Sequence, residues 1–232
     1  ARYTDVELKK LEKRIRKVYE EAGRDIDAKM ADFAERHAKR DAKYRAMVAD
    51  GKMSQADYEA WMRGQVFQGK QWAAKKEQIA NTLYHANDTA QKMINGQTTD
   101  VFAFNANYMS YSMEHDAGVD LGLNMYDSAA VTRLIKDDPN ILPFKKLNRE
   151  KDVRWNWQNL RGQLTQGIIQ GESIDKITSR LAKEVPNRNW KQMRTHARTA
   201  FTSAQNAGRQ ESLRAVLHSV PNRAFQMFWF FS

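Results

Sequence analysis

The chain has 232 residues, of which 41% are hydrophobic and 28% charged, and it contains no cysteine. This composition excludes a disulfide framework and a thiolate metal site, and the lack of an apolar run of about 20 residues excludes a membrane-spanning helix. The 38 Lys and Arg residues against 28 Asp and Glu residues give a formal net charge of +10, which favours an anionic partner such as nucleic acid. An ordinary solvated helix surface is the alternative source of this charge, because KKLEKRIRK interleaves basic and acidic residues.

Residues 1–96 are predicted to form a long antiparallel helical hairpin. The first arm follows a capping box at Thr4-Asp5-Val6-Glu7, and its apolar residues repeat at near-heptad spacing from Leu8 to Phe33. Such a stripe needs a second helix to bury it, and helical stability in proteins comes mainly from this kind of packing.

The second arm is predicted to begin after a turn. The segment DGKMSQAD places Gly51 in the turn and Ser54 at a new N-cap. An apolar stripe then runs from Trp61 to Ile94, and Asn95-Gly96 is the predicted end of the helix.

Residues 97–147 are richer in aromatic residues and turn formers, which indicates short helices and loops. Phe104, Tyr108 and Tyr111 are interpreted as core residues, with a partner-binding surface as the alternative. Asp127-Ser128 predicts an N-cap for the short helix AAVTRLIKD.

Residues 148–232 are predicted to form a helical domain that ends in an apolar strand. One helix carries a stripe from Val153 to Ile168, Gly171 breaks it, and Ser173 caps a second helix. A final helix ends near His218, and AFQMFWFF after Pro221 has strand character. The predicted fold class is therefore mostly α: a long hairpin, a smaller helical domain and a short C-terminal β segment.

The final helix divides into two unlike faces at about 100° per residue. Its small face, which predicts close approach of another backbone, consists of Ala197, Ala200, Ala204 and Gly208. Its polar face, which we interpret as a partner-binding face or as a site of internal ion pairs, consists of Arg198, Thr202, Gln205 and Arg209. Internal pairing of the arginines is the preferred interpretation, and both roles suit the planar guanidinium fork.

No pattern in the sequence indicates an enzyme, a metal site or a cofactor. The histidines do not stand in an HxxxH or HExxH arrangement; they are His37, His85, His115, His196 and His218. The cluster Glu114-His115-Asp116 points in different directions on a helix, and the chain has neither a Gly-rich phosphate loop nor a nucleophile elbow. We therefore predict no catalytic residues, no metal ligands and no cofactor.

The segment ARTAFTSAQNAGRQESLRA, preceded by QGESIDKITSRLAKEV at 170–185, resembles the phage head morphogenesis family, the minor capsid proteins related to protein F of phage Mu. Three further stretches are similar to minor capsid proteins of phages of low-GC Gram-positive hosts: NANYMSYSMEHDAGVD, VTRLIKDDPNILP and WNWQNLRGQLTQGIIQGES. The residues that match the family signature, which is one of assembly and packing, are Arg198, Thr199, Ala204, Asn206, Gly208 and Arg209.

The resemblance implies a structural virion protein without enzymatic activity, located inside the head near the portal and in the host cytoplasm during assembly. Its implied partners are the portal protein, the major capsid or scaffold protein, and double-stranded DNA bound without sequence preference, with no membrane in the resting state. Family members continue past an aromatic strand into a D-x-R-x-R-x-x-H segment, so the resemblance also implies that the natural chain continues beyond Ser232. Two alternatives stay open: a basic helical nucleic-acid-binding protein outside the virion, and the N-terminal part of a larger enzyme or toxin.

Overall fold

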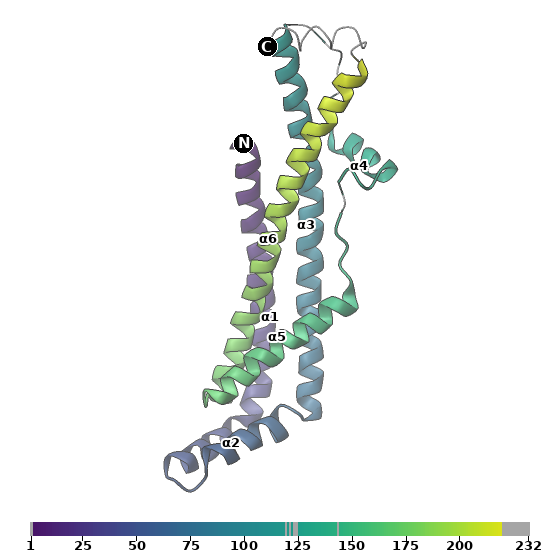
Figure 1. The fold of residues 1–232 in the computed structure, drawn as a ribbon. Coiled ribbons are helices and arrows are strands. Elements are labelled where there is room, and N and C mark those ends of the chain that lie inside the picture. Colours follow the sequence, from purple (N-terminus) through teal and green to yellow (C-terminus); the bar gives the residue numbers. More distant parts are fainter. Residues whose placement is uncertain (1, 119, 121, 123–124, 143, 220–232) are drawn as a thin grey trace. The chain divides into compact units, whose positions relative to one another are not determined.

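The computed structural model describes residues 2–118, 120, 122, 125–142 and 144–219 (Figure 1). Within these residues the chain is mostly helical, as predicted, and the helices are α1 (Arg2–Ala49), α2 (Gln55–Trp61), the π-helix η1 (Met62–Val66), α3 (Lys70–Ala117), α4 (Ser128–Asp137), α5 (Arg149–Ile169) and α6 (Ile174–Ser219). The strand predicted after Pro221 lies outside the described residues.

The predicted helix end at Asn95-Gly96 is wrong, because α3 continues through it to Ala117. Gly96 does not adopt the positive φ of a helix C-cap. The hydroxyl groups of Thr98 and Thr99 instead donate to the carbonyl oxygens of Asn95 and Gly96 within the helix. Burial of the following Val101 and Phe102 outweighs the cost of about 1 kcal/mol that a glycine imposes on a helix interior. Residues 97–117 are therefore helical where short helices and loops were expected.

The predicted capping box at the start of α1 is also wrong. The helix begins at Arg2, so Thr4 lies inside it, and its buried side chain accepts a hydrogen bond from Asn105 Nδ2 over 3.3 Å. A threonine near the start of a helix can thus form a contact with another helix instead of capping its own.

The second arm begins at the predicted N-cap but is not one helix. Ser54 accepts a hydrogen bond from the backbone N–H of Asp57, which confirms the cap. The chain then passes through η1 and a bend before α3 starts. This break turns Phe67 toward the core, where its ring lies 5.8 Å from Phe33 and 5.0 Å from Trp72. On an uninterrupted helix Phe67 and Trp72 would point in different directions.

Helix α6 is one continuous helix where two were expected. Its N-cap is Ser173, as predicted, and Gly171 before it has a φ of +65°. Pro186 lies inside the helix and has no N–H to donate to Ala182. The carbonyl oxygen of Ala182 faces α1, where a Cβ on Gly23 would lie 3.0 Å from it.

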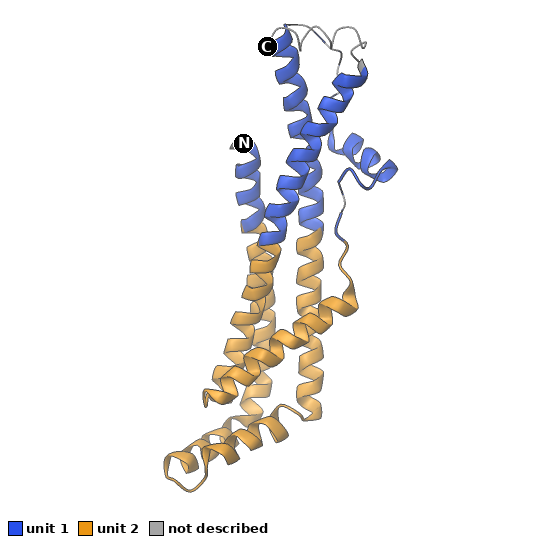
Figure 2. Ribbon diagram, viewed as in Figure 1, with its two compact units in different colours: residues 1–12, 92–145, 195–232 blue, residues 13–91, 146–194 orange. Residues whose placement is uncertain are grey.

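The chain divides into two compact units, each assembled from segments far apart in the sequence (Figure 2). Unit 1 contains residues 1–12, 92–145 and 195–232, and unit 2 contains residues 13–91 and 146–194. The units do not coincide with the ranges 1–96, 97–147 and 148–232 that the sequence suggested as domains, and those ranges stay a prediction.

Within unit 2, α1 and α3 run antiparallel. Tyr19 bonds to Asn87, and Lys75, twelve residues earlier in α3, bonds to Asp32 of α1. The core of this unit is closed by α5 and α6, and its fully buried side chains include Ile26, Met30, Ile79, Leu83, Leu160, Ile177 and Leu181.

Candidate partner-binding surfaces

The small face of α6 packs against α3 in unit 1. Ala197 and Ala204 are fully buried. A Cβ on Gly208 would lie 2.4 Å from the carbonyl oxygen of Phe102 and 3.1 Å from the backbone nitrogen of Ala106. Neither atom can move without moving the α3 backbone, so only glycine fits this position.

The contact continues one turn further with two serines that sequence reasoning missed. Ser212 is fully buried and donates to the carbonyl oxygen of Ala106 over 2.6 Å. Its hydroxyl also lies 3.3 Å from that of Ser110. Ser212 follows Gly208 by four residues, and this small-residue spacing was the signal available in the sequence.

The residues on the polar face of α6 differ in their partners and in their burial. Arg198 Nε lies 2.6 Å from Glu12 Oε1 in α1, so the preferred interpretation of internal pairing is confirmed for this residue. The hydrogen bond to Glu12 raises the pKa of Arg198. Arg209 is half-buried, and within the described part of the chain it forms no ion pair.

An open groove of about 430 Å³ runs beside this ion pair in unit 1. Its α6 wall contains Arg198, Thr202 and Gln205, and its α1 wall contains Thr4 and Glu12. The Thr202 hydroxyl donates to the carbonyl oxygen of Arg198, so its hydrogen atom is already used within the helix. Three of the four residues on the predicted polar face therefore line one groove, and Arg209 stands apart from it.

The remaining signature residues take different positions. Thr199 and Asn206 are exposed, and Ala204 and Gly208 are buried. Thr199 borders a small pocket of about 160 Å³ together with His196 and Asn95. Asn95 Nδ2 donates to the carbonyl oxygen of Lys145, which links the backbone at residue 145 to α3. Burial lowers the pKa of His196, and the positive charge of Lys145 lowers it further by a smaller amount.

Two of the three aromatic residues interpreted as core are on the surface. Tyr108 and Tyr111 are 58% and 63% exposed, so the core interpretation is wrong for them. Phe104 is half-buried and stacks on Tyr3 with 3.9 Å between the ring centroids. The face of α3 that meets α6 carries Phe102 and Ala106, and the tyrosines lie on a different side of the same helix. Exposed Leu213 and Leu217 add apolar surface on α6.

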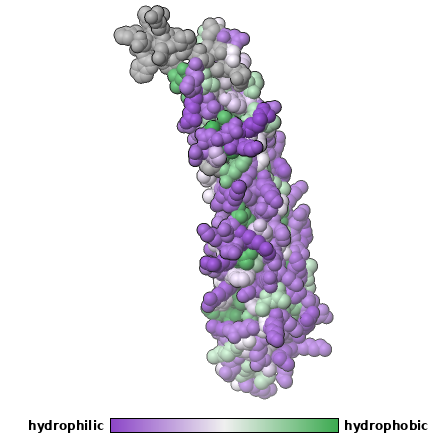
Figure 3. All heavy atoms as spheres, turned by 90° about the vertical axis from the view of Figure 1, so that its right-hand side faces the viewer, coloured by the Kyte–Doolittle hydropathy of each residue, from purple (hydrophilic) through white to green (hydrophobic). Residues whose placement is uncertain are grey.

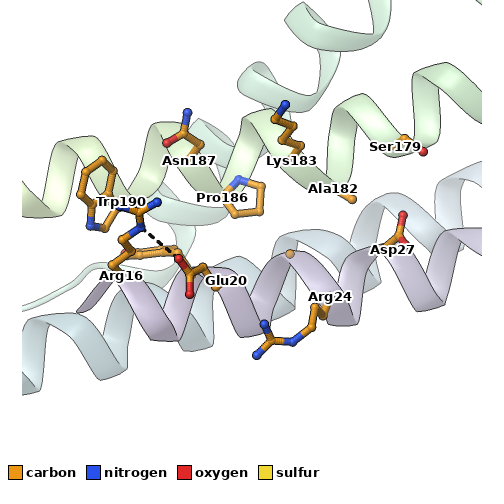
Figure 4. A pocket seen from close by; sticks show the side chains of 12 residues that line it. Arg16, Glu20, Arg24, Asp27, Ser179, Ala182, Lys183, Pro186, Asn187 and Trp190 are labelled. Atoms are coloured by element: carbon orange, nitrogen blue, oxygen red, sulfur yellow. Dashed lines mark hydrogen bonds and ion pairs between the residues drawn. The ribbon is translucent and has the colours of Figure 1, made fainter. Parts of the chain in front are cut away.

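Unit 2 contains a larger groove, of about 570 Å³, between α1 and α6 (Figure 4). Pro186 and Trp190 of α6 face α1. Gly23 of α1 lies opposite Pro186, because a Cβ at position 23 would be 3.9 Å from Pro186 Cγ. Arg16 on the α1 side is paired with Glu20 over 2.9 Å. No local pattern in the sequence indicates this groove, because its walls lie more than 150 residues apart in the chain.

A polar network lies inside unit 2 beneath α5. Tyr19 donates to Asn87 Oδ1 over 2.6 Å, and Asn87 Nδ2 donates to Asp152 over 2.8 Å. Asn156 also donates to Asp152, and Asn189 donates in turn to Asn156. Burial raises the pKa of Asp152 to about 6, against the opposing effect of the two amide hydrogen bonds.

Within the described residues, no helix contains an apolar stretch that could span a membrane. On the face drawn in Figure 3, hydrophilic residues predominate and hydrophobic ones form small scattered groups. In the described part of the chain, no group of three His, Asp or Glu side chains is arranged to hold a metal ion.

Comparison of the chain with models of protein families, with curated proteins and with solved structures finds no match.

Proposed function

We propose that the protein is a phage minor capsid protein of the head morphogenesis type, which associates with the portal inside the head and assists head assembly and the packaging or ejection of DNA. The observation that carries this proposal is the resemblance of residues 197–215 to the family signature. The close approach of Gly208 to Phe102 supports it, because it gives the signature glycine a packing role.

The proposal includes the finer architecture that the sequence suggests, a helical hairpin followed by a smaller helical domain and a β segment after Pro221. In this view the docking surface for the portal lies in unit 1. Exposed Tyr108 and Tyr111 support this assignment, because exposed tyrosines are enriched at protein interfaces. Arg209 is a second candidate contact. It is half-buried and forms no ion pair within the described residues, so an acidic side chain of the partner would pair with its guanidinium group. The major capsid or scaffold protein is a further partner.

The role is structural rather than enzymatic, with no cofactor and no membrane in the resting state. The net charge of +10 supports contact with packaged double-stranded DNA through its phosphates, without sequence preference. The same charge favours the alternative of a basic nucleic-acid-binding protein outside the virion, so the deciding experiment must measure association with heads.

The test is co-assembly. Phage heads are purified from cells that produce the portal, scaffold and major capsid proteins together with the tagged chain, and the chain is quantified in the particles by mass spectrometry. We expect a few copies per head, and we expect heads assembled without the portal to contain none. Equal amounts in heads with and without portal, or none in either, would contradict the proposal. An unrelated basic helical protein of similar size controls for non-specific trapping.

A further inference from the structure

The net charge of the chain resides in one of its two units. Unit 1 contains 11 Lys and Arg residues and 11 Asp and Glu residues, whereas unit 2 contains 27 and 17. Unit 1 is therefore neutral by this count, and unit 2 carries the whole net charge of +10. An anionic polymer attracted by the charge of this protein is attracted to unit 2.

Within unit 2, the outer face of α5 is basic and almost free of acids. Lys151, Arg154 and Arg161 are exposed on it, and none of them forms an ion pair within the described residues. The helix contains two acids: Glu150 is exposed, and Asp152 is held in the internal polar network. On α1, by contrast, basic and acidic residues are interleaved: Arg16 is paired with Glu20 and Lys29 with Asp25, and Glu21 and Asp27 lie among the other cations of this helix.

Two cations from neighbouring helices flank this face, and each is held on a tryptophan ring of α5. Arg188 of α6 lies 5.8 Å from the centroid of Trp155, and Lys76 of α3 lies 4.8 Å from that of Trp157. Trp157 remains 40% exposed. A cation placed on an indole ring loses part of its side-chain freedom before any ligand arrives, so it costs less to order when an anion binds.

We propose that these five cations form a phosphate-binding surface for double-stranded nucleic acid. The α5 surface consists of Lys76, Lys151, Arg154, Arg161 and Arg188. This inference rests on the proposed contact with packaged DNA and assigns it to one surface of unit 2. The partner is bound through its phosphates, and its bases are not read.

The geometry favours a duplex over a single strand. Lys151 and Arg161 are ten residues apart on α5, about 15 Å along the helix axis. B-DNA carries one negative charge for each ~1.7 Å of its axis, so a span of this length faces several phosphates. Single-strand binding uses free aromatic faces for base stacking in a groove. Here the cations already occupy faces of both indoles, and none of the grooves described above includes an α5 residue.

The experiment measures binding of the full chain to a fluorescent 30-base-pair duplex by anisotropy across a salt series. The test variant replaces Lys151, Arg154 and Arg161 by Gln. For five phosphate contacts we expect the wild-type logarithmic salt slope to be about −4 to −5, and the variant to lose about 2 to 3 units of it. Affinity of the variant at the lowest salt is expected to fall at least about tenfold.

Two control variants remove the same charge elsewhere. One replaces Lys13, Lys17 and Arg24 on α1 in the same unit by Gln, and the other replaces Lys9, Arg133 and Lys136 in unit 1; all six side chains are exposed. We expect both controls to retain most of the wild-type slope. A loss in the α1 variant equal to that in the α5 variant would show a diffuse charge effect and overturn the assignment to α5.

Two further arms identify the ligand. A single strand of the same sequence and anionic lipid vesicles replace the duplex, and binding of either one with an affinity above that of the duplex would overturn the proposal. Circular dichroism of each variant excludes unfolding as the cause of lost binding. The in vitro result is independent of head association, so a protein that binds DNA through α5 but never enters heads would contradict the proposed function and leave this inference standing.

Discussion

Gly208 of α6 and Phe102 of α3 are packed so closely that any side chain at position 208 would overlap the carbonyl oxygen of Phe102. This contact fixes the distance between the two helices in unit 1, and Ser212 extends it by one turn through its hydrogen bond to Ala106. Gly208 and Ser212 therefore have a packing role within unit 1.

Replacing Gly208 should consequently destabilise the fold. Gly208→Leu forces the two backbones apart, and such overpacking typically costs about 1 to 3 kcal/mol or more. We expect a lower midpoint in thermal unfolding followed by circular dichroism. Gly96→Ala is the matched control, because a Cβ there has nothing within 4 Å and alanine favours a helix interior. A Gly208→Leu protein that melts with the wild type would mean that this helix contact is absent in solution.

The features predicted from sequence are those determined by neighbouring residues. The N-caps at Ser54, Asp127 and Ser173 follow from hydrogen bonds that span three residues. The small face of α6 follows from helical periodicity alone. Local signals failed at Thr4 and Gly96, because packing between helices decided the outcome there.

The candidate sites depend on contacts that no local pattern contains. Arg198 and Glu12 are separated by 186 positions in the sequence, and Asn87 and Asp152 by 65. Helical periodicity predicts which face of a helix is polar, but the pairing between two faces depends on the register of the helices, which is set by the whole core. The α5 surface was missed for the same reason, because Lys76 and Arg188 come to it from other helices.

The buried network in unit 2 should respond to loss of one hydroxyl group. Tyr19 and Asn87 are both almost fully buried, so Tyr19→Phe leaves the Asn87 oxygen without its donor. An unsatisfied buried acceptor costs about 1 to 3 kcal/mol, and we expect a drop of this size in the free energy of unfolding measured with urea. Tyr111→Phe removes a hydroxyl from an exposed ring and should change little. Equal effects of the two substitutions would contradict the network.

Asp152 should make stability depend on pH in a direction opposite to that of most carboxylates. Its pKa is raised in the folded protein from 3.8 to about 6, so the folded state binds more protons than the unfolded state between these values. The contribution of Asp152 to the free energy of unfolding is fully present below pH 3.8 and is lost as the pH rises through 6. Because the side chain is only half-buried, we expect the loss to be about 1 kcal/mol.

The measurement is the free energy of unfolding at several pH values between 4 and 8. Asp152→Asn should reduce the fall in stability across this range. The new amide also alters the hydrogen bonds from Asn87 and Asn156, so the quantity to compare is the slope of the free energy of unfolding against pH rather than its absolute value. Glu150→Gln, an exposed change on the same helix, is the control. An unchanged slope in Asp152→Asn would show that the carboxyl group titrates alike in both states.

The two arginines of the polar face should behave differently, because one is paired and the other is not. Arg198 and Glu12 form an ion pair whose arginine is half-exposed, and such pairs add little to stability, so Arg198→Ala should fold with almost the same melting temperature. Arg209 forms no ion pair within the described residues, so Arg209→Ala should also stay folded. If the polar face docks on the portal, Arg209→Ala lowers the amount of protein in purified heads, and the control Lys136→Ala, an exposed change on α4, does not. Normal amounts of a normally stable Arg198→Ala, Arg209→Ala double variant in heads would show that this face is only a solvated surface.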